Sequence, residues 1–390
     1  MTKSFTFFLF FLFFSGLGQK IPILGFLGVP EDNATPKNYK TMEGAGFSLS
    51  LMTFSNHENA LKALNAARNS NIKLILSYPE LYSEPQKVIP EIRNHPALEA
   101  YYMGDEPSPT DFIGYINYAE KIKKYDQSHF FYANLYPNYV PSQSIKGLSY
   151  EDYITEAINK LPFSFISFDH YPLVNNKVRG NYYENLEIIR EKSQKSNKSF
   201  WGFACATIHF DYLEPKIEGI KLQHFANLLY GAQGLQYFTY WTDPFWKKDY
   251  SYAIVDSKGD PTPTYHIVKK VNEQIQRLAW VFLGAKADAV FHTGNEIPQG
   301  TKKLSSLPDR FKFFSTYGKN ALVSFMTNRK RKFVIIQNKS LTDDLTLEYQ
   351  FDKPMKKVNN KSGETINLSI SKKYKTDILP GDILIFTYGN

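Results

Sequence analysis

The sequence predicts an α/β fold, a (β/α)8 TIM barrel followed by a small C-terminal all-β sandwich domain. Three observations indicate it. Eight short apolar or aromatic runs alternate with helix-like segments, their starts recur at intervals of roughly 25 to 37 residues, and the pattern changes after about residue 285 to short strands separated by turns. That interval suits one strand–helix unit, and eight units over about 260 residues match the size of such a barrel.

The predicted barrel strands are apolar almost throughout, as is typical of strands covered on both faces. In chain order they are Ile23–Val29, Phe47–Phe54, Ile72–Tyr78, Leu98–Met103, Phe130–Leu135, Phe163–Phe168, Phe200–Ala206 and Leu235–Tyr240. Apolar residues at helical spacing predict helices over Glu58–Asn69, Asp111–Lys124, Glu184–Lys195 and about Pro263–Leu283. An open doubly wound sheet alternates in the same way, but Gly28-Val29-Pro30 after the first strand is no dinucleotide fingerprint, which favours the barrel.

The segment after the last helix has a different texture, with charged or Asn, Gly and Pro turns between short strands. These strands are predicted at Ala321–Met326, Phe333–Asn338, Leu345–Phe351, Thr365–Ile370 and Ile383–Tyr388. We therefore divide the chain into a signal peptide (1–18), a barrel (19–285) and a β-sandwich domain (286–390). The signal peptide is predicted from Lys3, the apolar run Phe5–Phe14 and the small residues of Ser15–Gly18.

The apolar run is too short to cross a hydrocarbon core of roughly 30 Å, so no stable membrane insertion is expected. The signal peptide predicts an exported protein, either periplasmic or extracellular. The net charge of +8 is concentrated in residues 301–390, which hold 17 Lys and Arg against 8 Asp and Glu. These Lys residues are scattered through strand-like segments, so no nucleic-acid partner is expected. The lone Cys205 lies in an apolar run and is interpreted as a buried, inert thiol.

Polar and aromatic residues gather where the predicted strands end. Because function in a barrel lies at the carboxyl ends of its strands, these residues are the candidate site. In order along the chain they are Tyr78, Asp105, Glu106, Asn134, Tyr136, Asp169, His170, Tyr171, Thr207, His209, Tyr240 and Trp241. Aromatic rings, amides and carboxylates are what a sugar site requires: platforms for the flat faces, partners for the hydroxyls and groups that act on the acetal.

Glu106 is the predicted general acid, since glycoside hydrolysis commonly needs a protonated carboxyl near the leaving oxygen. Aromatic neighbours and Asp105 would raise its pKa. The alternative is that Asp105 and Glu106 only cap the following helix, although Ser108 and Asp111 can do so. Asp169 is a candidate nucleophile or sugar-binding residue, and Glu214 a further candidate for the second group. The sequence indicates no cofactor and no metal, because no paired-histidine motif accompanies a carboxylate.

Three segments resemble secreted bacterial glycoside hydrolases with a (β/α)8 barrel, in the broad clan of family 42 and family 5. They are Tyr101–Pro107, Ser167–Pro172 and Tyr230–Trp241. The resemblance implies a carbohydrate substrate, an oligo- or polysaccharide, and a retaining enzyme with a Glu acid/base after strand four and a Glu nucleophile after strand seven. Glu106 matches the first position, with Asp105 in place of the usual Asn.

The second position departs from that pattern, because strand seven ends in Ala206-Thr207-Ile208-His209, without Glu. The Asp105-Glu106 pair instead resembles family 20 and family 123 hexosaminidases, in which Asp orients the substrate's acetamido group and Glu protonates the leaving group. We therefore expect a glycosidase that cleaves a β-linked glycan. The alternatives are a substrate-assisted N-acetylhexosaminidase, a non-catalytic carbohydrate-binding barrel, and an interaction module that acts through its β domain.

Overall fold

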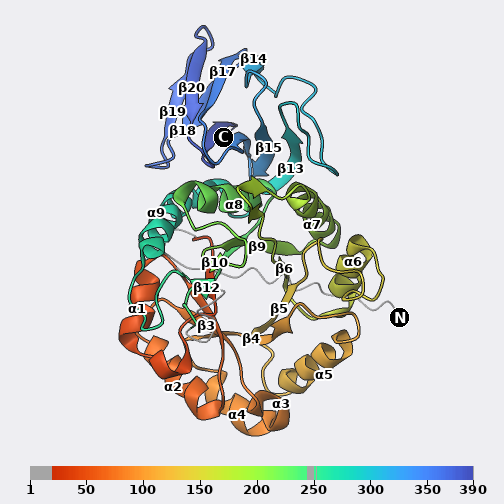
Figure 1. Ribbon diagram of the computed structural model, residues 1–390, viewed down its shortest axis with the longest axis vertical. Coiled ribbons are helices and arrows are strands. Elements are labelled where there is room, and N and C mark those ends of the chain that lie inside the picture. Colours follow the sequence, from red (N-terminus) through yellow and green to blue (C-terminus); the bar gives the residue numbers. More distant parts are fainter. Residues whose placement is uncertain (1–19, 244–249, 252, 390) are drawn as a thin grey trace, which may run out of the picture.

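The computed structural model describes residues 20–243, 250–251 and 253–389, without the side chains of His209, Tyr250 and Ser251. The predicted signal peptide lies outside the described residues. Eight parallel strands close into a barrel inside a ring of helices, and antiparallel sheets follow, so the predicted fold class is confirmed (Figure 1). Among the helices described, none combines the length and the apolar character needed to cross a membrane.

The barrel strands pair in the order β1-β11-β9-β6-β5-β4-β3-β2, with β1 and β2 closing the ring. Their bounds are β1 (Ile23–Phe26), β2 (Leu49–Thr53), β3 (Lys73–Ser77), β4 (Leu98–Asp105), β5 (Phe130–Leu135), β6 (Phe165–Phe168), β9 (Ser199–Cys205) and β11 (Gly234–Phe238). Each overlaps one of the eight predicted strands, and β5 has the predicted bounds. Barrel strands four, six, seven and eight are therefore β4, β6, β9 and β11.

The helices cover the outside of the barrel (Figure 1). Three of them begin after Thr35, Asn56 or Ser149, whose side chains accept a backbone N–H of the first turn. The bounds are η1 (Glu31–Asn33), α1 (Pro36–Gly44), α2 (His57–Ala67), α3 (Glu80–Ser83), α4 (Pro85–Ile92), α5 (Phe112–Lys123), α6 (Tyr150–Lys160), α7 (Tyr182–Ser196), α8 (Ile217–Leu229), α9 (Pro263–Arg277) and α10 (Ala279–Phe282). The predicted helix 263–283 is thus two helices, because the backbone leaves helical geometry at Leu278 (φ −98°, ψ 5°).

Two apolar layers hold the barrel together. Alternate strand residues fill the interior, among them Leu24, Leu51, Ile75, Tyr102, Tyr132, Phe165, Trp201 and Phe203. The residues between them face outward and pack against the helices in a larger cluster. Burial on both faces explains why the strand sequences are apolar throughout.

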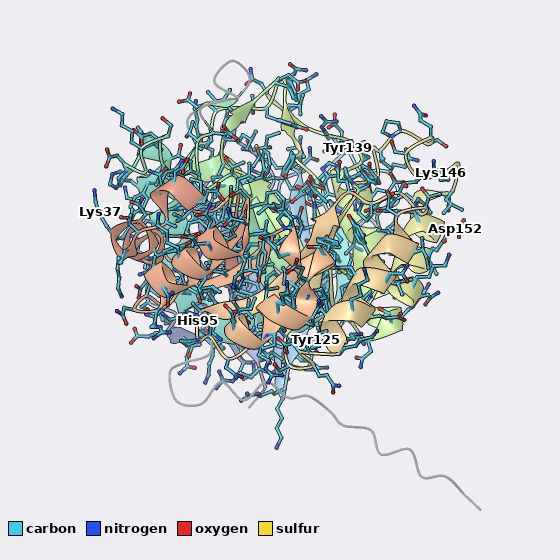
Figure 2. The ribbon with its side chains drawn as sticks, turned by 90° about the horizontal axis from the view of Figure 1, so that it is seen from below. Lys37, His95, Tyr125, Tyr139, Lys146 and Asp152 are labelled. Carbon is cyan, nitrogen blue, oxygen red and sulfur yellow. The ribbon has the colours of Figure 1, made fainter. Side chains whose placement is uncertain are left out.

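The two ends of the barrel differ in their connections. Figure 2 shows Tyr139, which follows β5, on the upper side, and His95 and Tyr125, which precede β4 and β5, on the lower side. At the upper, C-terminal end, the connection after β6 forms a hairpin of β7 (Leu173–Val174) and β8 (Lys177–Val178). The connections after β9 and β11 pair with each other through β10 (Ile208–His209) and β12 (Tyr250–Ser251). We call this end the C-terminal rim.

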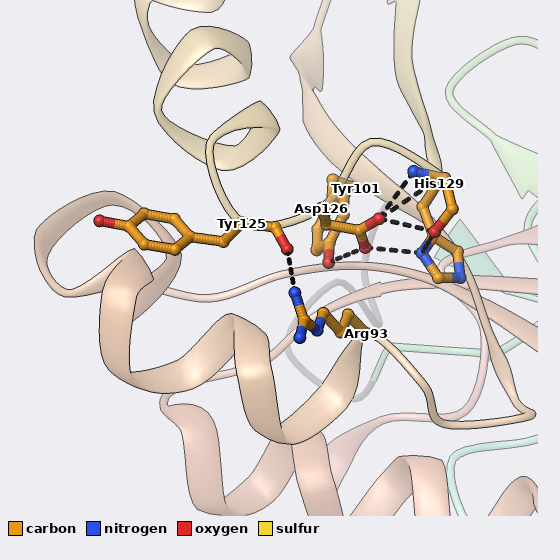
Figure 3. Close-up of polar contacts among 6 residues, drawn as sticks. Arg93, Tyr101, Tyr125, Asp126 and His129 are labelled. Atoms are coloured by element: carbon orange, nitrogen blue, oxygen red, sulfur yellow. Dashed lines mark hydrogen bonds and ion pairs between the residues drawn. The ribbon is translucent and has the colours of Figure 1, made fainter.

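At the N-terminal end, Asp126 fixes the turn between α5 and β5 (Figure 3). Its carboxylate accepts hydrogen bonds from the Tyr101 hydroxyl at 2.8 Å and from the Ser128 hydroxyl at 2.7 Å, and lies 2.6 Å from His129 Nδ1. Although burial alone would raise the pKa of Asp126, these donors lower it to about 2. This cluster stabilises the end of the barrel opposite the rim.

The C-terminal region contains a six-stranded and a three-stranded antiparallel sheet, ordered β13-β15-β16-β21-β18-β19 and β14-β17-β20. The strands are β13 (Lys286–His292), β14 (Phe311–Ser315), β15 (Ala321–Asn328), β16 (Arg331–Asn338), β17 (Leu345–Phe351), β18 (Met355–Val358), β19 (Thr365–Leu368), β20 (Tyr374–Ile378) and β21 (Ile383–Tyr388). On β16, Val334 and Ile336 belong to the core shared by the two sheets, whereas Phe333 and Ile335 belong to the barrel's outer cluster. At β16 the larger sheet is therefore buried on both faces, whereas its edge strand β19 is largely exposed.

Candidate active site

Three carboxyl groups lie at the C-terminal rim around one amide. Asp105 ends β4, Glu106 follows it, and Asp169 follows β6. Between them Asn134 of β5 donates from Nδ2 to Asp105 Oδ1 at 3.0 Å and to Asp169 Oδ1 at 3.1 Å. We call Asp105, Glu106 and Asp169 the carboxylate cluster.

A buried chain of hydrogen bonds orients the Asn134 amide. Ser167 Oγ donates to Asn134 Oδ1 at 2.9 Å and accepts from Gln236 Nε2 at 2.9 Å. The Tyr132 hydroxyl in turn donates to Gln236 Oε1 at 2.5 Å. Because the Asn134 oxygen is occupied by Ser167, its NH2 group faces the carboxylates, and the strands of the barrel interior set that orientation.

A β-bulge in β4 turns Asp105 into the barrel. Tyr102 points to the interior, so regular alternation would direct Asp105 toward the helices. The register shifts between Tyr102 and Gly104, however, and Asp105 then pairs with Asn134 on β5. The extra residue thus brings Asp105 onto the inward face, beside an amide that binds it.

The backbone on either side of Asp105 has unusual geometry. Gly104 has φ +149°, and a Cβ at that position would lie 2.0 Å from the Tyr115 hydroxyl oxygen on α5. Glu106 has φ 44°, and its N–H donates to the Asn134 carbonyl at 2.8 Å. A non-glycine residue with positive φ is uncommon and is retained where the surroundings fix it. Here β5 fixes it, and Asp105 and Glu106 both remain at the site.

Burial and the neighbouring charge act together on Glu106. Burial raises its pKa, and Asp105 raises it further, to about 7. The pKa of Asp105 is also raised by burial, although the hydrogen bonds from Asn134 and from the Glu106 backbone oppose this. Asp105 is enclosed by the barrel wall on one side and exposed to solvent on the other, so it carries its charge more easily than an enclosed carboxyl.

Asp169 is the most enclosed member of the cluster. Burial raises its pKa well above the usual value, and the charges of Glu106 and Asp105 add to the effect. Hydrogen bonds from Asn134 and Tyr171 work in the opposite direction. The charge of Asp105 therefore opposes the ionisation of Glu106, and the charges of both oppose the ionisation of Asp169.

Neither Asp105 nor Glu106 is needed as a helix cap. Helix α5 begins at Phe112, with Asp111 at its N-terminal boundary. The Asp111 carboxylate accepts from the backbone N–H of Ser108 at 2.9 Å and from its hydroxyl at 2.8 Å. The turn before α5 is thus held by Asp111 and Ser108, while Asp105 binds across the barrel to Asn134.

Two of the predicted aromatic residues adjoin the carboxylate cluster. Tyr171 lies in the barrel interior, where its hydroxyl hydrogen-bonds to Asp169. Tyr136 is half-buried, and after burial the largest influence on its raised pKa is the charge of Glu106. These rings stand beside the carboxyl groups, where a sugar would need apolar surface.

Four other predicted residues point away from the cluster. Tyr78, Tyr240 and Trp241 belong to the outer layer, between the strands and the helices. Tyr78 hydrogen-bonds to His57 at 3.1 Å. His170 is buried against Tyr182 of α7 and the ring of Tyr139, and burial lowers its pKa to about 3. These four residues follow strands, as the sequence indicated, but successive residues after a strand point in different directions, and theirs lead away from the carboxylate cluster.

The loop after β9 supplies no carboxylate next to the end of the strand. Thr207 is buried there, its carbonyl accepting from the Cys205 thiol at 3.3 Å, and the exposed Glu214 stands farther along the loop. The His209 side chain lies outside the described residues. Cys205 itself is buried and free, and burial raises the pKa of its thiol to about 12. That environment suits an inert thiol, as the sequence predicted.

Sequence reasoning missed several residues that shape this end of the barrel. Ser167 and Gln236 are polar residues inside predicted strands, a signal that could have identified them as interior partners. Tyr139, Arg179 and Tyr212 lie in rim loops, where nothing in the sequence marks which residues approach the site. Among the described residues no group of three or more His, Cys, Asp and Glu side chains is arranged to hold a metal ion.

The fold and site together define a (β/α)8 barrel with carboxyl groups at the C-terminal ends of strands four and six and a C-terminal β domain. No family model matches the sequence, and no curated protein matches it. Similar solved structures do exist, and they share this architecture over nearly the whole chain.

Three of these structures illustrate the likeness. A catalytic mutant of a family 42 β-galactosidase from G. stearothermophilus has a TM-score of 0.64 and 9% identity, with 95% of this chain and 98% of that chain covered. The β-galactosidase from Bacillus circulans sp. alkalophilus has a TM-score of 0.62 and 8% identity, covering 94% and 99%. A family 39 glycoside hydrolase from Bacteroides cellulosilyticus has a TM-score of 0.56 and 11% identity, covering 94% and 80%. At such identities the likeness establishes a shared fold.

Proposed function

We propose that this protein is a glycoside hydrolase that cleaves a β-linked glycan at the C-terminal rim, with Glu106 as general acid. The observation that carries the proposal is the carboxylate cluster, in which burial and Asp105 raise the pKa of Glu106 to about 7. A carboxyl group with that pKa is protonated in a useful fraction at neutral pH and can still release its proton. The fold shared with β-galactosidases agrees with this activity.

The reaction would proceed by proton transfer from Glu106 to the leaving glycosidic oxygen as the bond from the anomeric carbon to that oxygen breaks. The ionised Glu106 then takes a proton from the water that adds to the anomeric carbon, which restores the acid. Asn134 would hold Asp105 and Asp169 in place through both steps, since its NH2 group binds both.

Substrate assistance is the mechanism that these residues favour. A covalent glycosyl-enzyme needs an ionised carboxylate opposite Glu106, whereas Asp169 is enclosed with a strongly raised pKa and β9 ends at Cys205 without a carboxylate. Attack by an N-acetyl group of the substrate requires only a carboxylate that orients it. Asp105, held by Asn134 and open to solvent on one side, can fill that role.

The activity is tested by hydrolysis of a panel of aryl β-glycosides that includes N-acetylhexosaminides. We expect turnover in the wild type and a loss of about 10²- to 10⁴-fold in kcat/KM for Glu106→Gln. Glu120→Gln, an exposed position on α5, is the matched control and should retain full activity. Glycan binding without turnover in the wild type would instead indicate the carbohydrate-binding alternative.

We also propose that the protein is exported, on the strength of the apolar run within residues 1–18. Expression of the full chain in a bacterium with a secretory pathway should yield a mature protein shortened by about 18 residues. Mass measurement of the mature protein checks this, and an intact N-terminus in the cytoplasm would contradict it.

A further inference from the structure

Arg179 lies where three loops of the C-terminal rim meet. It directly follows β8, in the connection after β6, and its guanidinium lies 4.4 Å from the ring centroid of Tyr139 and 5.6 Å from that of Tyr212. Tyr139 belongs to the loop after β5 and Tyr212 to the loop after β9, and their hydroxyls hydrogen-bond to each other. Figure 2 shows Tyr139 at the upper end of the barrel. The guanidinium is therefore held against two rings at the end where the carboxylate cluster lies.

The two rings that contact Arg179 are also influenced by the charge of Asp169. The pKa values of Tyr139 and Tyr212 are raised mainly by burial, and the charge of Asp169 contributes to both. His170 packs against the Tyr139 ring at a centroid distance of 4.9 Å. Tyr139 thus contacts both the Arg179 guanidinium and His170, the residue next to Asp169 in the chain, so Arg179 and the carboxylate cluster lie in the same part of the rim.

Within the part of the chain that the structure describes, no carboxylate pairs with the positive charge of Arg179. Among the residues that the structure describes, the ion pairs do not include Arg179, and its buried Nε has no hydrogen-bond acceptor. Asp169 of the carboxylate cluster accepts hydrogen bonds from Asn134 and Tyr171 instead. Arg179 as a whole is half-buried, but a buried donor such as its Nε is ordinarily paired, so an unpaired Nε beside a proposed substrate site indicates an acceptor from outside the chain.

We propose that Arg179 binds an anionic substituent of the glycan, the carboxylate of a uronic acid or a sulfate ester, on the sugar next to the bond that is cleaved. The planar guanidinium presents its donors in a fork that matches the oxygens of either anion, and the stacked rings fix its orientation before the glycan arrives. An anionic sugar would otherwise be repelled by the carboxylate cluster, and a neutral sugar would need no fixed cation. This inference rests on the proposed glycan site.

A purely structural role for Arg179, stacking on two rings to join the loops, is the competing explanation. It predicts that replacement of Arg179 loosens the loops and weakens the binding of every glycan to the same extent. Recognition of an anion predicts that replacement weakens the binding of anionic glycans and leaves the binding of neutral glycans unchanged. Lys177 in the same hairpin is exposed and provides a control that removes one nearby positive charge.

The test measures binding by calorimetry in the Glu106→Gln background, so that no glycan is consumed. The ligands are three sets of β-linked oligosaccharides of equal length: neutral, uronic-acid-containing and sulfated. We expect one anionic set to bind more tightly than the neutral set. Arg179→Gln should weaken the binding of that anionic set about 10- to 100-fold and leave the binding of the neutral set unchanged. Arg179→Lys should give an intermediate loss, Lys177→Gln none, and added salt should weaken only the anionic set.

The outcomes separate this inference from the proposed activity. Equal weakening of neutral and anionic glycans by Arg179→Gln, or no anionic set that binds, overturns the role of Arg179. If the wild type hydrolyses neutral glycosides and Arg179→Gln leaves selectivity unchanged, the hydrolase proposal stands and this inference fails. If anionic glycans bind through Arg179 but are never cleaved, this inference stands and the hydrolase proposal fails. Comparison of the uronate and sulfate sets identifies the anion.

Discussion

Asp105 and Glu106 are adjacent in the sequence, yet their surroundings give them different electrostatic properties. Asp105 accepts from Asn134 and has an open side, whereas Glu106 combines burial with the repulsion of its neighbour. Burial raises the pKa of both groups, and the charge of Asp105 raises that of Glu106 further, to about 7, which suits a general acid. Their surroundings differ because Asp105 accepts hydrogen bonds from Asn134 and from the Glu106 backbone, whereas Glu106 is subject to the charge of Asp105.

Asp105→Asn should lower the pKa of Glu106, because the Asp105 charge is one of the two causes that raise it. The acid form of Glu106 would then be lost at lower pH. We expect kcat/KM of the wild type to decline from about pH 7, the pKa of Glu106, and this decline to move to lower pH in the variant. A pH–rate profile on one aryl glycoside checks it. An unchanged alkaline limb would show that another group is the acid.

Glu106→Gln should stabilise the fold at high pH. The folded-state pKa of Glu106 is raised from 4.5 to about 7, so its neutral form is favoured in the folded protein, and wild-type stability falls as pH rises from about 4.5 to 7. The variant has no carboxyl group to ionise at this position, so it should be more stable than the wild type at pH 8 by about 1–2 kcal/mol, a figure reduced for the partial solvent exposure of the group. At pH 4 the two proteins should have the same stability. Urea unfolding at both pH values measures the difference.

For Glu106→Gln the matched control is again Glu120→Gln, since an exposed helix position should change stability by no more than about 0.5 kcal/mol at either pH. If Glu106→Gln gives the same difference at pH 4 as at pH 8, the stabilisation does not come from the ionisation of Glu106.

At the scale of the element, the position of Asp105 at the site depends on one inserted residue in strand β4. Without the register shift after Tyr102, Asp105 would face α5 and lose Asn134 as a partner. Gly104 makes the bulge possible because its φ of +149° is rarely open to other residues and because Tyr115 occupies the space that a Cβ would fill.

Gly104→Ala should therefore disturb both the strand and the site. We expect a loss of about 1–3 kcal/mol in the free energy of unfolding and a reduced kcat with little change in expression of folded protein. Gly114→Ala is the control: this glycine lies in α5 with no atom within 4 Å of an added Cβ, so alanine should stabilise by about 0.5–1 kcal/mol. Thermal unfolding and kinetics of both variants decide it, and a neutral Gly104→Ala would contradict the role of the bulge.

At the scale of the whole molecule, the β domain is joined to the barrel by buried polar contacts as well as apolar ones. Asp382, in the turn before β21, accepts from Lys221 Nζ of α8 at 2.6 Å and from Gln274 Nε2 of α9 at 3.0 Å. Gln337 of β16 donates to the Leu222 carbonyl at 3.0 Å. Figure 1 shows the sheets against α7, α8 and α9, on the side of the barrel and away from its open end.

Because of these contacts we expect the barrel and the β domain to unfold in one cooperative transition. Asp382→Ala leaves Lys221 and Gln274 without their acceptor and should cost about 2–4 kcal/mol, lowering the single midpoint. Asp377→Ala, at an exposed position on β20, should change it little. Scanning calorimetry checks both, and two separate transitions in the wild type would contradict the coupling.

The pattern of barrel and β domain was determined by the sequence itself, because it follows from local periodicity. The bounds predicted for Phe130–Leu135, Leu345–Phe351 and Ile383–Tyr388 are those of β5, β17 and β21. Strands β13, β14, β18 and β20 were not predicted, and they include charged and half-exposed residues that a search for apolar runs passes over.

The composition of the site was decided by tertiary structure. The sequence indicated which residues follow each strand, and Asp105, Glu106, Asn134, Asp169 and Tyr171 do meet at the rim. The outward packing of Tyr78, Tyr240 and Trp241, and the approach of Arg179 from a loop, could not be predicted. The direction of a side chain after a strand depends on bulges, local φ angles and partners on other strands, and those are contacts between residues far apart in the chain.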